Sequence, residues 1–292
     1  MKQFLWTVTL SAVTLFGFAL PQYPLRIVSA EDFYGDVAQT IGGSYVNVTS
    51  IINDPTIDAQ FFNPPADVIN TVKNASLIIA NGNGYDAWMD TLYEKNQQKI
   101  PFLKVATATR IGNNFEPHIW FNPQTMPLFA NALVDQLSQL DPTNTSSYQS
   151  NLQGFLQMAK LYQIQLNKVT SQVAGMRVMS AEPVCNALLL ALQLKVTNRS
   201  IQLALANNIP LTVTQVNDLK DLLRDHAVDL FIYNASNPDS KLVTELINLA
   251  KAEHITVLGV YETMPPNIHY YQWMYQTLFS IRDALLSSKN AS

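Results

Sequence analysis

Short apolar runs rich in β-branched residues alternate along this chain with amphipathic stretches long enough to form helices. Such alternation is typical of βαβ units and of a mainly parallel sheet. The pattern predicts strands at Leu25–Ser29, Val46–Ile52, Leu77–Ala80, Ile100–Ala106, Arg177–Ser180, Leu194–Thr197, Val228–Tyr233 and Ile255–Val260. Four of these fall in each half of the chain. The sequence therefore predicts an α/β fold with two lobes, each a mainly parallel four-stranded sheet with flanking helices.

A single amphipathic stretch separates the two sets of strands. Apolar residues recur in it at spacings of three and four from Tyr148 to Val173, and Gly175 is well placed to end a helix there. About 28 helical residues would reach about 40 Å, enough to run along both lobes. We therefore predict a first lobe over residues 25–141, a bridging helix over residues 142–175 and a second lobe over residues 176–292.

The N-terminal segment is apolar and uncharged from Phe4 to Leu20 and is followed by Pro21. This layout is typical of a secretory signal, while about 17 apolar residues also reach the lower limit for spanning a bilayer. We expect residues 1–24 to be a signal peptide or an N-terminal anchor. The protein is then exported and lies at the cell surface, in the extracellular space or in the periplasm. The only cysteine, Cys185, is far from this end and cannot carry a lipid there.

The composition excludes one class of partner. Only 14% of the residues are charged and the net charge is −4, so the chain offers no basic surface for nucleic acid. A negative surface is compatible with a cationic ligand. We expect a protein that does not bind nucleic acid and acts as a monomer.

Four side chains that can bind a metal follow predicted strands: Gln60, His118, Glu182 and Glu262. In an open α/β sheet such loops converge at the carboxyl edge, where small ligands are held. Two carboxylates and one imidazole from different loops make a credible site for a divalent cation. The other histidines are weaker candidates, since His226 and His254 precede strands and His269 opens the last helix.

Each candidate also has a purely structural interpretation. His118 lies in a turn that Asn122 can fix by capping the next helix, but it could merely pack beside Trp120. Glu182 could be the N-cap of a helix that begins at the next residue. By composition alone, the loop around Gln60 consists of ordinary turn formers.

Several spaced motifs resemble the metal-binding solute receptors of ATP-driven zinc and manganese importers, the cluster A-I family. They are Ala30–Val37, Ile41–Gly43, Asn81–Met89, Pro117–Trp120 and Tyr261–Pro266 with Trp273 beyond, and the likeness covers Leu25 to Leu286. The family fold is two α/β lobes bridged by one long helix, in agreement with the pattern of strands.

The resemblance also implies roles for residues. His118 matches a direct metal ligand, Glu182 a position filled by histidine or glutamate, and Glu262 the carboxylate ligand of the second lobe. Relatives usually read Asp-Pro-His where this chain reads Asp58-Ala59-Gln60, so Gln60 stands in for a histidine. That pairing requires a one-residue gap nearby, which leaves Asp58 as a substitute candidate.

The resemblance implies capture of a divalent metal and its delivery to the membrane permease of an ABC importer. An oxygen-rich set with one imidazole suits both zinc and manganese, and the Irving–Williams order favours zinc at most sites. We therefore expect zinc first and manganese second. One alternative is a surface adhesion or interaction protein with a weakened metal site. A metal-dependent hydrolase is the less favoured one. We expect no enzyme, since the chain has no Gly-x-Ser-x-Gly, His-Glu-x-x-His or phosphate-loop motif.

Overall fold

The computed structural model describes residues 24–95, 99–112, 117–207, 209–236 and 240–291. The predicted signal or anchor lies outside these residues, apart from Pro24. Within the described ranges, no helix is both long enough and apolar enough to cross a membrane.

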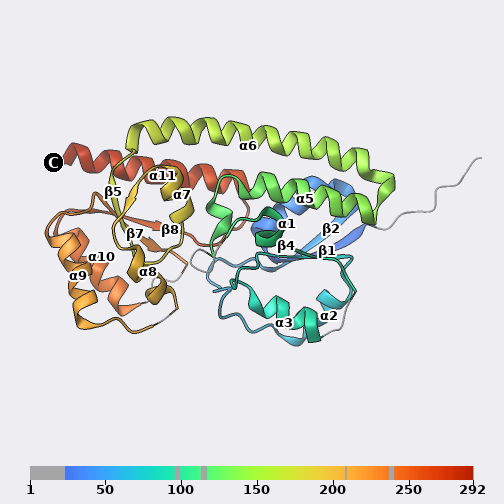
Figure 1. The fold of residues 1–292 in the computed structure, drawn as a ribbon, viewed down its shortest axis with the longest axis horizontal. Coiled ribbons are helices and arrows are strands. Elements are labelled where there is room, and N and C mark those ends of the chain that lie inside the picture. Colours follow the sequence, from blue (N-terminus) through green and yellow to red (C-terminus); the bar gives the residue numbers. More distant parts are fainter. Residues whose placement is uncertain (1–23, 96–98, 113–116, 208, 237–239, 292) are drawn as a thin grey trace, which may run out of the picture.

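Two four-stranded parallel sheets form the two lobes (Figure 1). The first sheet has the order β2 (Val46–Ile52), β1 (Leu25–Glu31), β3 (Leu77–Ala80) and β4 (Phe102–Lys104). The second has the order β6 (Lys195–Val196), β5 (Arg177–Ser180), β7 (Leu230–Asn234) and β8 (Thr256–Val260). The predicted fold class is confirmed, and three strands have the predicted bounds.

Other strand bounds differ from the prediction. The run predicted as a strand over Ile100–Ala106 pairs only over Phe102–Lys104, because α4 (Val105–Thr109) begins directly after it. The strand predicted at Leu194–Thr197 is reduced to Lys195–Val196. Both are outer strands of their sheets, where a single neighbour leaves pairing less constrained.

The two sheets repeat one topology, and their registers match. Ser29 of β1 is paired with Ile79, and Ser180 of β5 is paired with Ile232. Each serine begins a Ser-Ala-Glu triplet, and its hydroxyl donates to the glutamate carbonyl two residues on, at 2.7 Å and 2.6 Å. The two triplets therefore occupy equivalent places at the carboxyl ends of the inner strands.

The same register relates two asparagines. Asn81 lies two residues after Ile79, and Asn234 lies two residues after Ile232. Both are buried. Each lobe thus has an asparagine at the carboxyl end of its second inner strand.

Helices cover the faces of the sheets. In the first half they are α1 (Asp32–Gly42), η1 (Gly43–Tyr45), α2 (Ala66–Lys73), α3 (Ala87–Lys95), α4, η2 (Ile119–Phe121), α5 (Thr125–Leu140) and η3 (Pro142–Asn144). They continue with α6 (Thr145–Val173), α7 (Asn186–Ala191), α8 (Arg199–Ala206), α9 (Val213–Arg224), α10 (Lys241–Ala252) and α11 (Tyr270–Ala291).

The predicted bridging helix is present as α6, which has 29 residues and is followed by Gly175 at φ 80°. Figure 1 shows α6 along one side of both lobes, with α11 beside it. The chain thus passes between the lobes through α6 and again in the segment before α11, and α11 then runs back to the second lobe, where Ser288 lines a cavity with Arg177. The division of the lobes at residues 141 and 176 stays a prediction.

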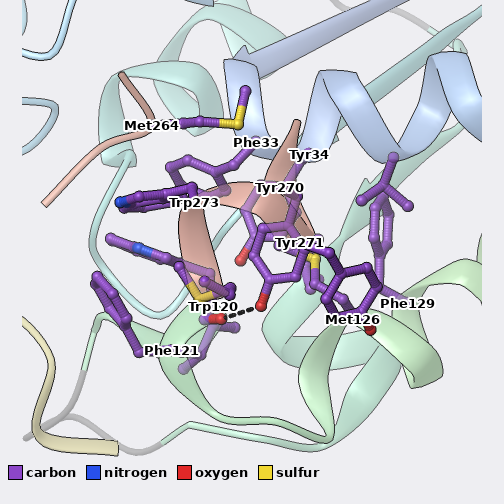
Figure 2. Packing of buried hydrophobic residues seen from close by; sticks show 14 of the residues in the cluster. Phe33, Tyr34, Trp120, Phe121, Met126, Phe129, Met264, Tyr270, Tyr271 and Trp273 are labelled. Atoms are coloured by element: carbon purple, nitrogen blue, oxygen red, sulfur yellow. Dashed lines mark hydrogen bonds between the residues drawn. The ribbon is translucent and has the colours of Figure 1, made fainter. Parts of the chain in front are cut away.

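A buried aromatic cluster anchors the start of α11 to the first lobe (Figure 2). The rings of Phe33 and Trp120 stack with centroids 4.6 Å apart, and those of Phe121 and Trp273 meet edge to face at 5.3 Å. The Tyr270 hydroxyl donates to the Trp120 carbonyl at 2.7 Å. Offset and edge-to-face pairs are the favoured geometries for aromatic rings. This packing ties the C-terminal helix to the first lobe.

The stripe on α6 gives a matched test of the bridging helix. Leu166 is 2% exposed and Leu161 is 49% exposed. We expect Leu166→Ala to lower the free energy of unfolding by about 2–5 kcal/mol, because it opens a cavity in the core. Leu161→Ala should change it by no more than about 0.5 kcal/mol. Urea unfolding of both variants measures this, and equal losses would contradict the orientation of α6.

Candidate metal centre

The predicted ligands of the two lobes meet at His118 and Glu262. The Nε2 atom of His118 lies 3.3 Å from Oε1 of Glu262, and the two side chains are 4% and 11% exposed. His118 directly precedes η2 in the first lobe, and Glu262 follows β8 in the second. Two residues 144 positions apart by their numbering are thus brought into contact at the carboxyl edges of the sheets.

The backbone around His118 is held from both sides. Asn81 donates through Nδ2 to the Pro117 carbonyl at 3.0 Å, and the Trp120 indole donates to the Glu262 carbonyl at 3.0 Å. The imidazole meets the Trp120 ring edge to face, with centroids 5.2 Å apart. His118 therefore packs beside Trp120, as its structural interpretation requires, and also faces Glu262.

The capping prediction for the following helix is wrong in its position. The helix α5 begins at Thr125, with Gln124 as its N-cap. Asn122 lies before it and accepts a hydrogen bond from the Gln124 backbone N–H through Oδ1 at 3.0 Å. The asparagine thus fixes the turn that precedes the helix.

Both oxygens of Glu262 are hydrogen-bonded. Tyr85 donates through its hydroxyl to Oε1 at 2.7 Å, and Asn234 donates through Nδ2 to Oε2 at 2.6 Å. Burial alone raises the pKa of Glu262, but hydrogen bonding and charge from His118, with the bonds from Tyr85 and Asn234, hold it below its ordinary value. Glu262 is therefore present as a carboxylate.

Glu182 joins this pair through Asn234, whose Nδ2 also donates to Glu182 Oε2 at 3.0 Å. Burial raises the pKa of Glu182 and the charge of Glu262 raises it further, while the Asn234 bond opposes both. The N-cap interpretation of Glu182 is wrong, because α7 begins at Asn186 with Cys185 as its N-cap. The side chain is thus available to the centre.

The first-lobe loop brings Asp58 toward the centre. The Gln60 backbone N–H donates to Asp58 Oδ1 at 2.9 Å. Burial raises the pKa of Asp58, as does the charge of Glu262, while His118 opposes them. A cavity of about 160 Å³ separates the lobes here and is lined by Thr56, Ile57, Asp58, Ser236, Glu262 and Thr263. The Asp58 carboxylate, rather than the Gln60 side chain, is the group with charge interactions to the predicted ligands.

The remaining histidines lie elsewhere. His226 and His254 line a cavity of about 690 Å³ together with Arg177 and Ile255, near the amino ends of β5 and β8. His269 is exposed and its Nδ1 lies 2.7 Å from Asp36 Oδ1 in α1. Among the residues that the structure describes, no three His, Cys, Asp or Glu side chains already stand in metal-binding geometry. The candidate centre consists of the His118–Glu262 pair, with Glu182 linked to Glu262 through Asn234 and Asp58 lining the same cavity as Glu262.

Tyr85 and Asn234 support the centre and were not predicted from the sequence. Tyr85 falls within the Asn81–Met89 motif, and Asn234 is the polar residue that ends the apolar run of β7. A polar residue at the carboxyl end of an inner strand was the available signal, because that edge is where the lobes meet.

Known proteins resemble this chain in sequence and in fold. The manganese ABC transporter substrate-binding lipoprotein scaA of Streptococcus gordonii is 27% identical over 147 residues, 46% of this chain and 47% of that protein. The chain spans about half the length of the curated relatives it matches. The names of these relatives describe substrate-binding proteins rather than enzymes.

Two solved structures have the same two-lobed fold. The periplasmic zinc-binding protein TroA of Treponema pallidum has a TM-score of 0.77 at 16% identity, covering 90% of this chain and 99% of that one. The Mn²⁺ complex of the solute-binding protein FpvC of Pseudomonas aeruginosa has a TM-score of 0.77 at 17% identity, covering 91% and 99%. The family described as zinc-uptake complex component A, periplasmic, matches residues 27–284, so this chain belongs to that family.

Proposed function

We propose that this protein captures a divalent metal ion between its lobes, zinc ahead of manganese, and delivers it to the permease of an ABC importer. The supporting observation is the 3.3 Å separation of His118 Nε2 and Glu262 Oε1. Two ligand atoms on a tetrahedral zinc with bonds of about 2.0–2.1 Å lie about 3.3–3.4 Å apart. One nitrogen and one oxygen donor, from different lobes, already have the spacing of two ligands on one ion.

The other ligands come from the same loops. Glu182 is linked to Glu262 through Asn234, and the Asp58 carboxylate lines the adjoining cavity. We favour Asp58 over the predicted Gln60 as the donor from the first-lobe loop, because an anionic oxygen binds a hard cation more strongly than a neutral amide. In this proposal the side chains of Glu182 and Asp58 turn toward the His118–Glu262 pair and complete the site.

Binding without turnover fits this arrangement. The names of relatives mention manganese and metal transport, and that of TroA mentions zinc. In this proposal the protein acts outside the cytoplasm as a monomer, with no nucleic-acid partner. Because the chain crosses between the lobes through both α6 and the segment before α11, release proceeds by movement of loops rather than by wide rotation of a lobe.

Titration calorimetry of the metal-stripped protein with zinc and then manganese tests the receptor. We expect one-to-one binding that His118→Ala abolishes. Asp58→Ala should weaken binding by at least about tenfold, as losses at other metal sites do, while Gln60→Ala, its neighbour in the same loop, has a smaller effect.

Two results would contradict these assignments. A larger loss of metal affinity in Gln60→Ala than in Asp58→Ala would show that Gln60 is the ligand from this loop. Absence of binding to either ion would overturn the receptor and favour an interaction protein with a weakened site.

Acidification should release the metal. Burial raises the pKa of Asp58 and of Glu182, so protons compete with a metal ion for these carboxylates up to a higher pH than usual. Affinity should therefore fall as the pH is lowered from about 7.5 to about 5.5. Glu262, with its lowered pKa, stays ionised and releases no proton.

Calorimetry in buffers of different ionisation enthalpy counts the protons released on binding. Glu182→Gln should release fewer protons than the unmodified protein, because an amide has none to lose. An equal count in both proteins at every pH between about 7.5 and about 5.5 would contradict competition between protons and metal at Glu182.

A further inference from the structure

The carboxamide of Asn234 lies between two of the proposed ligands. Its Nδ2 atom is 3.0 Å from Glu182 Oε2 and 2.6 Å from Glu262 Oε2, and the residue is 3% exposed. An amide nitrogen carries two hydrogens, so it can donate one to each carboxylate. Asn234 thus satisfies one oxygen of each acid.

The orientation of this carboxamide is fixed by a neighbouring loop. Asn234 Oδ1 accepts a hydrogen bond from the Ser236 backbone N–H at 2.9 Å. A backbone N–H can only donate, so the oxygen must face Ser236 and the nitrogen must face the two acids. The Ser236 hydroxyl also accepts from the Glu262 backbone N–H at 3.1 Å, which ties the Glu262 backbone to the same loop.

The two carboxylate oxygens of Glu262 have different partners. Oε2 accepts from Asn234, while Oε1 accepts from the Tyr85 hydroxyl at 2.7 Å, lies 3.3 Å from His118 Nε2 and faces the first lobe. Glu182 likewise has its Oε2 on Asn234. Asn234 thus contacts one oxygen of each acid, Oε2, and does not contact Oε1 of either.

Asn81, the equivalent residue of the first lobe, also forms a hydrogen bond next to a proposed ligand. Asn81, at the same register position, donates to the Pro117 carbonyl, one residue before His118. In both lobes an asparagine at the end of an inner strand orients a metal-facing residue. Asn234 differs in that it touches the carboxylates themselves.

We propose that Asn234 is a positioning residue that restricts Glu182 and Glu262 to one coordinating oxygen each and so favours zinc over manganese. This inference rests on the proposed function. Zinc is satisfied by four ligands, whereas manganese prefers a larger, octahedral set of oxygens. Two carboxylates that each use one oxygen for a hydrogen bond supply fewer ligand atoms than two that chelate, which suits the smaller coordination number.

The test compares Asn234→Ala and Asn234→Ser with the full protein. Calorimetry gives the ratio of zinc to manganese affinity, and the visible absorption of bound Co²⁺ reports coordination number, since four-coordinate Co²⁺ absorbs far more strongly than six-coordinate Co²⁺. Asn151→Ala is the matched control. The Asn151 side chain also donates one hydrogen bond through Nδ2, to the Ile41 carbonyl at 2.9 Å, but it lies away from the candidate centre.

We expect strong Co²⁺ absorption from the unmodified protein and weaker absorption from Asn234→Ala. The zinc-to-manganese ratio should fall by at least about tenfold in that variant, the size of effect seen when outer partners of metal ligands are removed. Asn234→Ser keeps one donor and should be intermediate, which also provides a result if the alanine variant does not fold. Asn151→Ala should leave both readouts unchanged.

An unchanged spectrum and ratio in the Asn234 variants would overturn the inference, as would equal losses of zinc and manganese affinity, which a purely structural role predicts. Both results require that the unmodified protein binds metal. If the unmodified protein binds neither ion, the receptor function itself fails and this inference fails with it.

Discussion

Hydrogen bonds and an ion pair from both lobes meet at the carboxylate of Glu262. Tyr85 from the first lobe and Asn234 from the second donate to its two oxygens, and His118 lies against the oxygen that Tyr85 contacts. Trp120 holds the backbone of the same residue. A buried carboxylate needs such partners, because an unpaired one would be expensive to remove from water. The two lobes therefore meet around one buried carboxylate.

The fold could be predicted because its signals are local. Alternating apolar runs gave the strands, and the unbroken stripe from Tyr148 to Val173 gave α6. Errors arose at element ends, where short-range signals compete. Val105 has the β-branched side chain of a strand residue but starts α4, and α5 begins beyond the capping asparagine Asn122.

The centre was less predictable because it depends on how side chains turn at the carboxyl edge. The sequence indicated that His118, Glu182 and Glu262 share that edge, and the structure brings them together through direct contact and through Asn234. It could not decide between Gln60 and Asp58, since which of two side chains in one irregular loop faces the cleft depends on backbone angles that the sequence does not specify. Asn234 carried no motif of its own, and its importance emerges from the registers of the two sheets.

The position of the Trp120 indole makes the fluorescence of the protein sensitive to the loop around Glu262. This ring is buried in the aromatic cluster, and its N–H is bonded to the carbonyl of Glu262. Indole emission depends on hydrogen bonding and on the field around the ring, so any shift of the Glu262 backbone acts on the fluorophore without an intermediary. The protein thus carries its own reporter of the loop around Glu262, and the proposed capture and release of a metal ion can be followed in real time without a label.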